Sequence, residues 1–283
     1  MPSRAVLITG CSSGIGHATA ELLQSQGWTV YATARRPESI ADLAAQGCKT
    51  LALDVTDEQS MSAAVAQVTD AEGAVGVLIN NAGYSQSGAI ETVPLADVRA
   101  QFETNVFGLI RMCQLALPGM RAQHWGKVVN IGSMGGRLSF PGAGLYHATK
   151  YALEALSDSL RFEVRGFGVD VILVEPGLIT TGFGDVASGS VAVAGDAEQS
   201  GPYADFNRQV AKLTAEAYTG PMIKLGGGPE KVAEAIAGAL AAKRPKARYP
   251  VTPSAHLLIN QRRITPDRVW DLMMRSQFPT PKP

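Results

Sequence analysis

The feature that most constrains the fold of this chain is a regular alternation of short strand-like runs with longer helical patterns. The strand-like runs cover residues 5–9, 29–33, 50–53, 77–80, 127–131 and 169–174. Several of them are continuously apolar, as expected of strands buried on both faces of a parallel sheet. The helical patterns between them include residues 15–26, 58–70, 95–123 and 145–164. This order predicts an α/β fold, a Rossmann-type doubly wound parallel sheet with right-handed crossovers.

Beyond residue 174 the alternation loosens without a clear domain boundary, so residues 1–283 are expected to form a single domain. Residues 182–228 begin with a stretch of small residues that is rich in glycine. This composition predicts a mobile substrate lid, with a helix at 203–218. A further helix at 229–242 and an edge strand at 248–251 are expected. The C-terminal extension, residues 252–283, carries Val269, Leu272 and Met273 at helical spacing. Packing of this helix against the domain is favoured, and contact with a partner or a membrane stays open.

Composition excludes several classes of function. The formal net charge is zero, which gives no electrostatic case for a nucleic-acid partner or an anionic membrane. The sequence contains no window of about 18 uninterrupted apolar residues, so no transmembrane span is expected. Cys11, Cys48 and Cys113 are far apart and odd in number, so they indicate neither a disulfide framework nor a metal site. A reducing, cytoplasmic location is therefore expected.

A glycine-rich loop follows the first predicted strand and opens the first long helix. It contains Gly10, Gly14 and Gly16, with Ser12 and Ser13 between them as hydrogen-bond donors. The glycines permit a tight turn and a close approach of backbone amides to a pyrophosphate, and a helix N-terminus adds partial positive charge. Binding of a pyrophosphate in this way requires a loop that joins a strand to a helix. Because this loop lies in that position, it predicts a dinucleotide site.

The end of the second predicted strand indicates which dinucleotide. NAD sites usually hold the ribose 2′-hydroxyl with an acid about 20 residues past the glycines. Here the strand runs into Arg35 and Arg36, and no acid appears before Glu38. An arginine suits a 2′-phosphate, so NADP(H) is expected, with Arg35 as the first candidate and Arg36 as the second. The alternative is that both arginines are solvated charges at a helix entry.

Tyr146 and Lys150 are four residues apart within a predicted helix, and on a helix such positions share a face. A nearby cation lowers the pKa of a phenol and makes it a usable acid or base near neutrality. Tyr31 also has a cation four residues on, Arg35, but it lies in a predicted strand, where that spacing is about 13 Å. Tyr146 is therefore the candidate proton donor. His147 is rotated about 100° from it and is expected to face elsewhere.

These motifs occur in a characteristic order. The chain shows Thr9-Gly10-x3-Gly14-x-Gly16, Asp54-Val55, Asn80-Asn81-Ala82-Gly83, Asn105, Ile131-Gly132-Ser133, Tyr146-x3-Lys150 and Pro176-Gly177-x3-Thr181. Over roughly residues 4–181, this order resembles the short-chain dehydrogenase/reductase family, in its single-domain, NADP-preferring branch. One departure is Ser13, where some NADP-dependent relatives carry a basic residue, which leaves most of the NADP prediction with Arg35.

The resemblance implies roles for individual residues. Asp54 and Val55 would contact the adenine, while Asn81, Ala82 and Gly83 would line the adenosine ribose. Pro176, Gly177 and Thr181 would contact the nicotinamide half, and Lys150 its ribose. The cofactor-binding set expected is Gly10, Ser12, Ser13, Gly14, Ile15, Gly16, Arg35, Arg36, Asp54, Val55, Asn81, Ala82, Gly83, Tyr146, Lys150, Pro176, Gly177 and Thr181.

The implied reaction is hydride transfer between nicotinamide and a carbonyl or alcohol carbon. Tyr146 would exchange a proton with the substrate oxygen, Lys150 would lower the pKa of Tyr146, and Ser133 would orient the oxygen. Asn105 resembles the family residue that holds a water in a proton relay to Lys150. A non-catalytic, NADP(H)-sensing protein is the alternative; an epimerase or dehydratase relative would need different glycine spacing.

The substrate and the assembly are less constrained. The substrate pocket is expected from residues 83–91, 134–144 and 182–225. Candidate lining residues are Met134, Leu138, Phe140, Leu145, Phe183, Tyr203, Phe206 and Met222. Such a pocket favours an apolar ketone, retinoid, steroid-like or lipid carbonyl. The resemblance also suggests that helices 95–123 and 145–164 pair with their copies, which would give a homodimer or homotetramer.

Overall fold

The structure is a computed structural model that describes residues 1–182, 187, 189 and 201–281. Its centre is a sheet of seven parallel strands in the order β3-β2-β1-β4-β5-β6-β7. The strands are β1 (Val6–Ile8), β2 (Val30–Ala34), β3 (Lys49–Ala52), β4 (Val77–Asn80), β5 (Gly126–Ile131), β6 (Val169–Pro176) and β7 (Arg248–Val251). The order reverses between β1 and β4, which is where doubly wound sheets bind their ligands. The predicted fold class and each predicted strand are confirmed.

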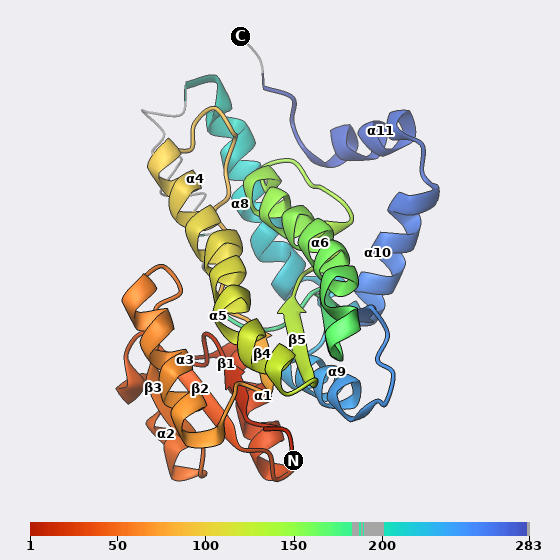
Figure 1. Ribbon diagram of the computed structural model, residues 1–283. Helices are drawn as coiled ribbons and strands as arrows, with labels where there is room; N and C mark the ends of the chain where they lie inside the picture. The colour runs from red at the N-terminus through yellow and green to blue at the C-terminus, as the bar shows by residue number, and fades with distance from the viewer. Residues whose placement is uncertain (183–186, 188, 190–200, 282–283) are drawn as a thin grey trace.

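Helices cover both faces of this sheet (Figure 1). They are α1 (Gly14–Ser25), α2 (Ala41–Ala45), α3 (Glu58–Glu72), α4 (Leu95–Phe102), α5 (Gly108–Ala122), α6 (Gly144–Val164), α8 (Ala204–Thr219), α9 (Pro229–Ala241), α10 (Pro253–Ile264) and α11 (Asp267–Gln277). Helices α1 and α9 pack with one face of the strands, and α3, α5 and α6 pack with the other. None of the helices in the described ranges is long and apolar enough to cross a membrane.

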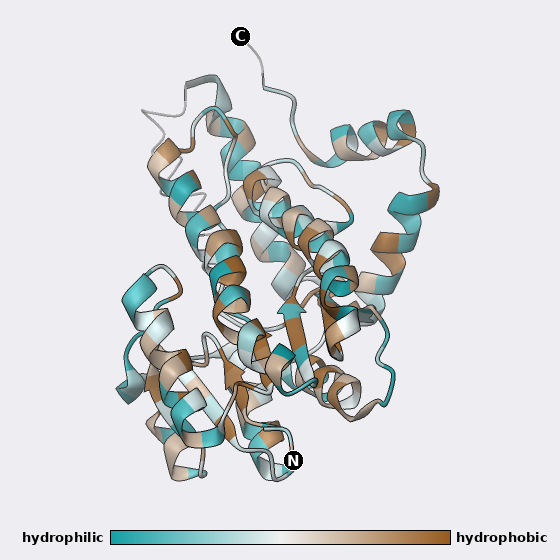
Figure 2. Cartoon of the chain, in the orientation of Figure 1, coloured by the Kyte–Doolittle hydropathy of each residue, from teal (hydrophilic) through white to brown (hydrophobic). Residues whose placement is uncertain are grey.

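Side-chain alternation along the strands explains the two cores. In β1, Val6 and Ile8 join the core shared with α1 and α9, while Leu7 joins the core on the opposite face. The same split occurs in β4, where Ile79 and Leu78 lie in different cores. Successive side chains of a strand point to opposite faces, so a strand covered on both sides must be apolar throughout. Figure 2 shows these largely hydrophobic strands at the centre of the fold.

The long helix expected at residues 95–123 is interrupted. A π-helical turn, Glu103–Phe107, separates α4 from α5, and the amide of Gly108 bonds the carbonyl of Glu103 five residues back. A Cβ at Gly108 would lie 2.5 Å from the Val55 carbonyl oxygen, so glycine lets α5 pack closely against the loop after β3. Single π turns of this kind are frequent at functional sites. This one contains Asn105.

The C-terminal extension differs from expectation in two ways. It contains a helix, α10, that the sequence pattern did not indicate. In α11 the buried residues are Trp270 and Met274, whereas Val269 is 49% and Leu272 68% exposed, so the predicted apolar face was wrong for these two. Trp270 and Met274 pack on Leu138, which places α11 over the loop after β5. Part of the expected lid, residues 183–186, 188 and 190–200, lies outside the described residues, which resume at Gly201 and include α8.

Candidate active site

The glycine loop lies at the carboxyl end of β1 and is held by the chain segment after β4. Gly10 and Gly14 adopt φ angles of 73° and 62°, a region that favours glycine. The side-chain amide of Asn81 donates to the carbonyl oxygens of Thr9 and Gly10, at 2.9 and 2.8 Å. A Cβ at Gly16 would lie 2.3 Å from the Gly10 carbonyl oxygen, so the loop closes tightly on the first turn of α1.

The first turn of α1 fits an anion. Its N-cap residue, Ser13, makes no side-chain capping bond, and the first turn carries no acidic residue. The amide groups of this turn therefore keep the partial positive charge of the helix end. Ser12, Ser13 and Gly14 line a cavity of about 1840 Å³ that also reaches Arg35. These features fit a dinucleotide whose pyrophosphate lies at the helix end.

The cavity collects most of the residues that the sequence singled out. Those that line it are Gly10, Ser12, Ser13, Gly14, Ile15, Arg35, Asp54, Val55, Asn81, Ala82, Gly83, Ser133, Tyr146, Lys150, Pro176, Gly177 and Thr181. Three predicted residues do not line it: Gly16, Arg36 and Asn105. Gly16 serves the close packing of the loop, and exposed Arg36 caps the short helix Pro37–Ile40 through its backbone. Of the two arginines, Arg35 lines the cavity and Arg36 does not.

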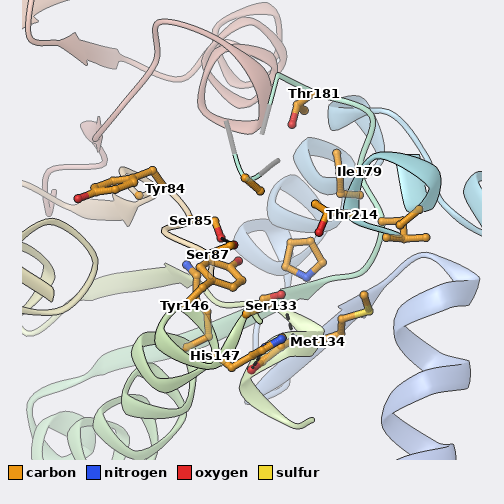
Figure 3. Close-up of a pocket in the computed structure, with 18 of the residues that line it drawn as sticks. Tyr84, Ser85, Ser87, Ser133, Met134, Tyr146, His147, Ile179, Thr181 and Thr214 are labelled. Atoms are coloured by element: carbon orange, nitrogen blue, oxygen red, sulfur yellow. Dashed lines mark hydrogen bonds between the residues drawn. The ribbon is translucent and has the colours of Figure 1, made fainter. Parts of the chain in front are cut away.

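Tyr146 and Ser133 meet at the middle of the cavity (Figure 3). Tyr146 lies in the first turn of α6, and Ser133 follows β5, where its hydroxyl accepts a hydrogen bond from the Gly135 amide at 3.0 Å. Burial raises the pKa of the Tyr146 phenol above its usual value, and the hydrogen bond with Ser133 opposes part of that rise. The phenol therefore holds its proton at neutral pH.

Lys150 lies one helical turn beyond Tyr146 and is buried. Its ammonium nitrogen donates to the carbonyl oxygen of Ile131 at 2.8 Å and lies 5.7 Å from the centre of the Tyr146 ring. Burial lowers the pKa of Lys150 to about 8. Burial is the dominant effect on the pKa of each group, and the expected lowering of the Tyr146 pKa by Lys150 stays a prediction.

Asn105 is buried in the π turn, and its side-chain amide is used in local contacts. The amide nitrogen donates to the Tyr84 carbonyl at 2.9 Å and to the Thr149 hydroxyl at 3.1 Å, and its oxygen accepts from the Tyr84 amide. Thr149 precedes Lys150 on α6. Asn105 therefore ties the loop after β4 to the catalytic helix, and its role in a water relay stays a prediction.

The substrate end of the cavity is largely apolar but differs in detail from expectation. Met134, Phe140 and Met222 line it as predicted, whereas Leu138, Leu145, Tyr203 and Phe206 do not. Phe183 lies outside the described residues. The C-terminal helices supply residues that the sequence pattern did not indicate, namely Leu258, Gln261, Trp270, Met273, Met274, Gln277 and Phe278. His147 also lines the cavity, so the prediction that it faces elsewhere was wrong.

A buried group of charges lies behind the site. Glu154 on α6 and Glu175 at the end of β6 are buried, and Arg248 approaches them at 2.9 and 3.7 Å. Arg137 lies 3.5 Å from Glu175. Burial, with hydrogen bonding to Glu175, raises the pKa of Glu154 to about 7. Glu175 directly precedes Pro176 and Gly177 of the cavity wall, so this charge group supports that wall from behind.

The raised pKa of Glu154 predicts a pH-dependent stability. The folded chain holds this proton over pH values where the unfolded chain has lost it, so the contribution is complete below pH 4.5 and is lost as the pH rises through about 7. A Glu154→Gln variant keeps a neutral side chain. We expect it to match the wild type below pH 4.5 and to exceed its free energy of unfolding above pH 7, measured by urea denaturation. Glu163→Gln, an exposed site on the same helix, is the control. An unchanged difference across this pH range would contradict the prediction.

Comparison with known proteins identifies the family. The model described as short chain dehydrogenase matches residues 4–188. The chain belongs to the short-chain dehydrogenase/reductase family. It is 37% identical over 278 residues to 3-ketodihydrosphingosine reductase of Bacteroides thetaiotaomicron, covering 97% of this chain and 98% of the relative. It is 39% identical over 264 residues to estradiol 17-beta-dehydrogenase 1 of Rattus norvegicus, covering 88% and 74% of the two chains.

A solved structure supports the same family. The crystal structure of a short-chain dehydrogenase from Streptomyces avermitilis matches with a TM-score of 0.78 and 34% identity, over 97% of each chain. As a short-chain dehydrogenase/reductase, the chain is an oxidoreductase that acts on alcohol or carbonyl groups. The predicted family and enzyme class are thereby confirmed.

Proposed function

We propose that this enzyme uses NADP(H) to interconvert an alcohol and a ketone within an apolar substrate. The observation that carries the proposal is a single cavity lined by Tyr146 and Ser133, by Arg35 after β2 and by apolar side chains of α11. A cofactor with a 2′-phosphate suits Arg35, and an apolar substrate suits Met134, Phe140 and Trp270. The similar proteins named for 3-ketodihydrosphingosine and estradiol support the substrate class, since both names denote largely hydrocarbon molecules.

The chemistry divides between the cofactor and the chain. Bound NADP(H) supplies or accepts the hydride. Tyr146 donates its proton to the carbonyl oxygen during reduction, and Ser133 hydrogen-bonds the same oxygen as negative charge develops on it. The raised pKa keeps Tyr146 protonated at neutral pH, which is the state that donates a proton during reduction. Lys150, fixed to the end of β5 through Ile131, places a positive charge beneath this proton donor.

The proposal is tested by following the absorbance of NADPH with a panel of ketones of increasing chain length and steroid ketones. We expect turnover of long-chain or polycyclic ketones, weak turnover of short anionic keto acids, and a higher kcat/KM with NADPH than with NADH. Preference for NADH would overturn the cofactor assignment. Turnover confined to small, charged keto acids would overturn the substrate class, and no turnover of any ketone would support a nucleotide-binding role without catalysis.

We also propose that the enzyme assembles through α5 and α6. Phe107, which ends the π turn before α5, is 52% exposed, and Tyr151 and Phe162 on α6 are 44% and 70% exposed. Ala148 and Ala155 leave the surface beside Tyr151 small. Large apolar side chains on adjacent helices are typical of an interface between copies. By contrast, Leu153 and Val164 of α6 are buried within the core of one copy.

This assembly predicts that the wild type is a dimer or tetramer at micromolar concentration, measured by light scattering. Phe162→Lys places a charge in the interface and should produce monomers. Ile264→Lys on α10, an apolar side chain that is 81% exposed, is the matched control and should not alter the mass. A monomeric wild type, or an unchanged mass for Phe162→Lys, would refute this interface.

A further inference from the structure

The outer surface of the C-terminal helices α10 and α11 gathers exposed apolar side chains. Four of the twelve large hydrophobic side chains that are exposed in the described part of the chain lie on these two helices. They are Leu257, Ile264, Val269 and Leu272, each about half exposed or more. A single exposed apolar side chain is ordinary, but this concentration on two adjoining helices indicates a binding surface.

The inner surface of the same helices is already used. Leu258 of α10 and Trp270 and Met273 of α11 line the substrate end of the cavity and pack in one apolar cluster. Leu272 is rotated about 200° around α11 from Trp270, so it points away from the cavity. Figure 1 shows α10 and α11 at the outer edge of the molecule, away from the sheet. The exposed side chains therefore lie on the outside of the wall whose inside faces the substrate.

Positive charge flanks these apolar side chains. Helices α10 and α11 carry four arginines and two aspartates, a formal net charge of +2, although the whole chain is neutral. Arg268 and Arg275 are exposed and form no ion pair within the described part of the chain. They lie four residues before and three residues after Leu272, so they flank it on one face of α11. Asp271 lies beside them and reduces this charge without cancelling it.

Apolar side chains flanked by arginines match the surface of a bilayer that contains anionic lipids. An arginine lays its aliphatic stem along hydrocarbon and keeps its guanidinium at the level of the lipid phosphates. Helices that lie in the plane of a membrane surface combine leucine-type side chains with basic residues in this way. A bilayer also concentrates apolar molecules, and the apolar end of the cavity lies directly behind this surface. Both charge and position therefore favour a lipid surface.

We propose that the outer surface of α10 and α11 docks on a bilayer that contains anionic lipids, and that an apolar ketone passes from the bilayer into the cavity behind these helices. Ile264 and Leu272 enter the hydrocarbon boundary, while Arg268 and Arg275 contact lipid phosphates. None of these four side chains lines the cavity, so they serve delivery and not the chemistry. Docking rests on the exposed side chains alone, whereas transfer of the ketone rests on the proposed function.

Vesicle flotation tests docking without any ketone. Vesicles of phosphatidylcholine alone are compared with vesicles of equal parts phosphatidylcholine and phosphatidylglycerol. We expect the wild type to bind the anionic vesicles at least about tenfold more tightly, and to be released as added salt screens the charges. Two double variants, Arg268→Gln/Arg275→Gln and Ile264→Ser/Leu272→Ser, should each lower the affinity for anionic vesicles at least about tenfold.

The matched control is Lys243→Gln/Arg244→Gln, which also removes two exposed cations. These residues precede β7 and α10 follows it, so they lie at the opposite edge of the parallel sheet. The control should keep the affinity for anionic vesicles within about threefold. All variants should bind NADPH within about threefold of the wild type, which shows that they are folded. A wild type that does not float with anionic vesicles, or equal losses in the control and the arginine variant, would overturn the docking surface.

A second measurement separates docking from the proposed function. A steroid ketone is incorporated in anionic vesicles, and a water-soluble methyl ketone is offered in solution, each with NADPH. Ile264→Ser/Leu272→Ser should reduce the vesicle-bound ketone about tenfold more slowly than the wild type, while kcat/KM for the soluble ketone changes less than threefold. Equal rates with the vesicle-bound ketone would overturn transfer from the bilayer. A lower mass of this variant in light scattering would assign the surface to contact between copies. A wild type that floats but reduces neither ketone would leave docking intact and end the proposed function.

Discussion

A Tyr146→Phe enzyme is expected to lose about 10²–10⁴-fold in kcat with any ketone, since this is what proton transfer by a placed side chain contributes. The variant keeps the ring that packs beside His147 but removes the only atom that can protonate the substrate oxygen from this position. Ser133 would remain as a hydrogen-bonding group without a proton donor beside it. The effect should therefore appear in kcat, while the affinity for NADPH, measured by fluorescence titration, stays within threefold.

Tyr31→Phe is the matched control for this loss. Tyr31 also has a basic residue four positions later, Arg35, but it lies in β2 and its hydroxyl contacts Lys49 and Glu72, away from the cavity. Its removal should leave kcat nearly unchanged. A Tyr146→Phe enzyme that keeps turnover within tenfold of the wild type would exclude the assigned role for Tyr146.

Arg35→Ala is expected to lower kcat/KM with NADPH by about 10- to 100-fold, because hydrogen bonds to charged groups contribute roughly 1.5–3 kcal/mol. With NADH, which lacks the 2′-phosphate, kcat/KM should change less than threefold. The preference for NADPH would then shrink because kcat/KM with NADPH falls, and not because kcat/KM with NADH rises. Steady-state kinetics with both cofactors at a saturating ketone concentration measure this directly.

Arg36→Ala provides the control, since Arg36 is exposed next to Arg35 but does not line the cavity. It removes the same charge from the surface and should change kcat/KM with NADPH less than threefold. Equal losses in the two variants would mean that the effect is a general attraction of positive charge for the cofactor. If Arg35→Ala lowers kcat/KM equally with NADPH and NADH, Arg35 does not bind the 2′-phosphate.

The sheet could be predicted from the sequence because burial on both faces leaves a clear pattern. Strand β1 is apolar throughout and β4 is apolar up to Asn80, with Gly10 two residues beyond β1 and Asn81 directly after β4. Residues carried by the ends of adjacent parallel strands, such as Ser133 and Pro176, then had to lie at one edge of the sheet. The cavity collects them for that reason.

Other features leave no such pattern. The π turn at Glu103–Phe107 inserts one residue into an otherwise continuous apolar periodicity. The pattern of residues 95–123 therefore predicted one long helix. Helix α10 carries few buried residues, Ser254 and Ala255, and gives almost no apolar stripe. His147 was expected to face away from the site because it is rotated from Tyr146 on the helix. The cavity, however, is wide enough to contact two sides of the first turn of α6. Burial, which dominates the pKa of Lys150, depends on the whole fold rather than on spacing.

The contribution of α10 and α11 to the cavity has a consequence for how such enzymes diverge. The proton donor, its companions and the nucleotide loop all precede residue 182, while the far wall of the substrate end comes from residues after Val251. Replacing the final helices with those of a relative would thus reshape what the enzyme accepts without disturbing how it reacts. New selectivity could arise at the tail of the chain through exchanges that the folded sheet and the catalytic step would tolerate.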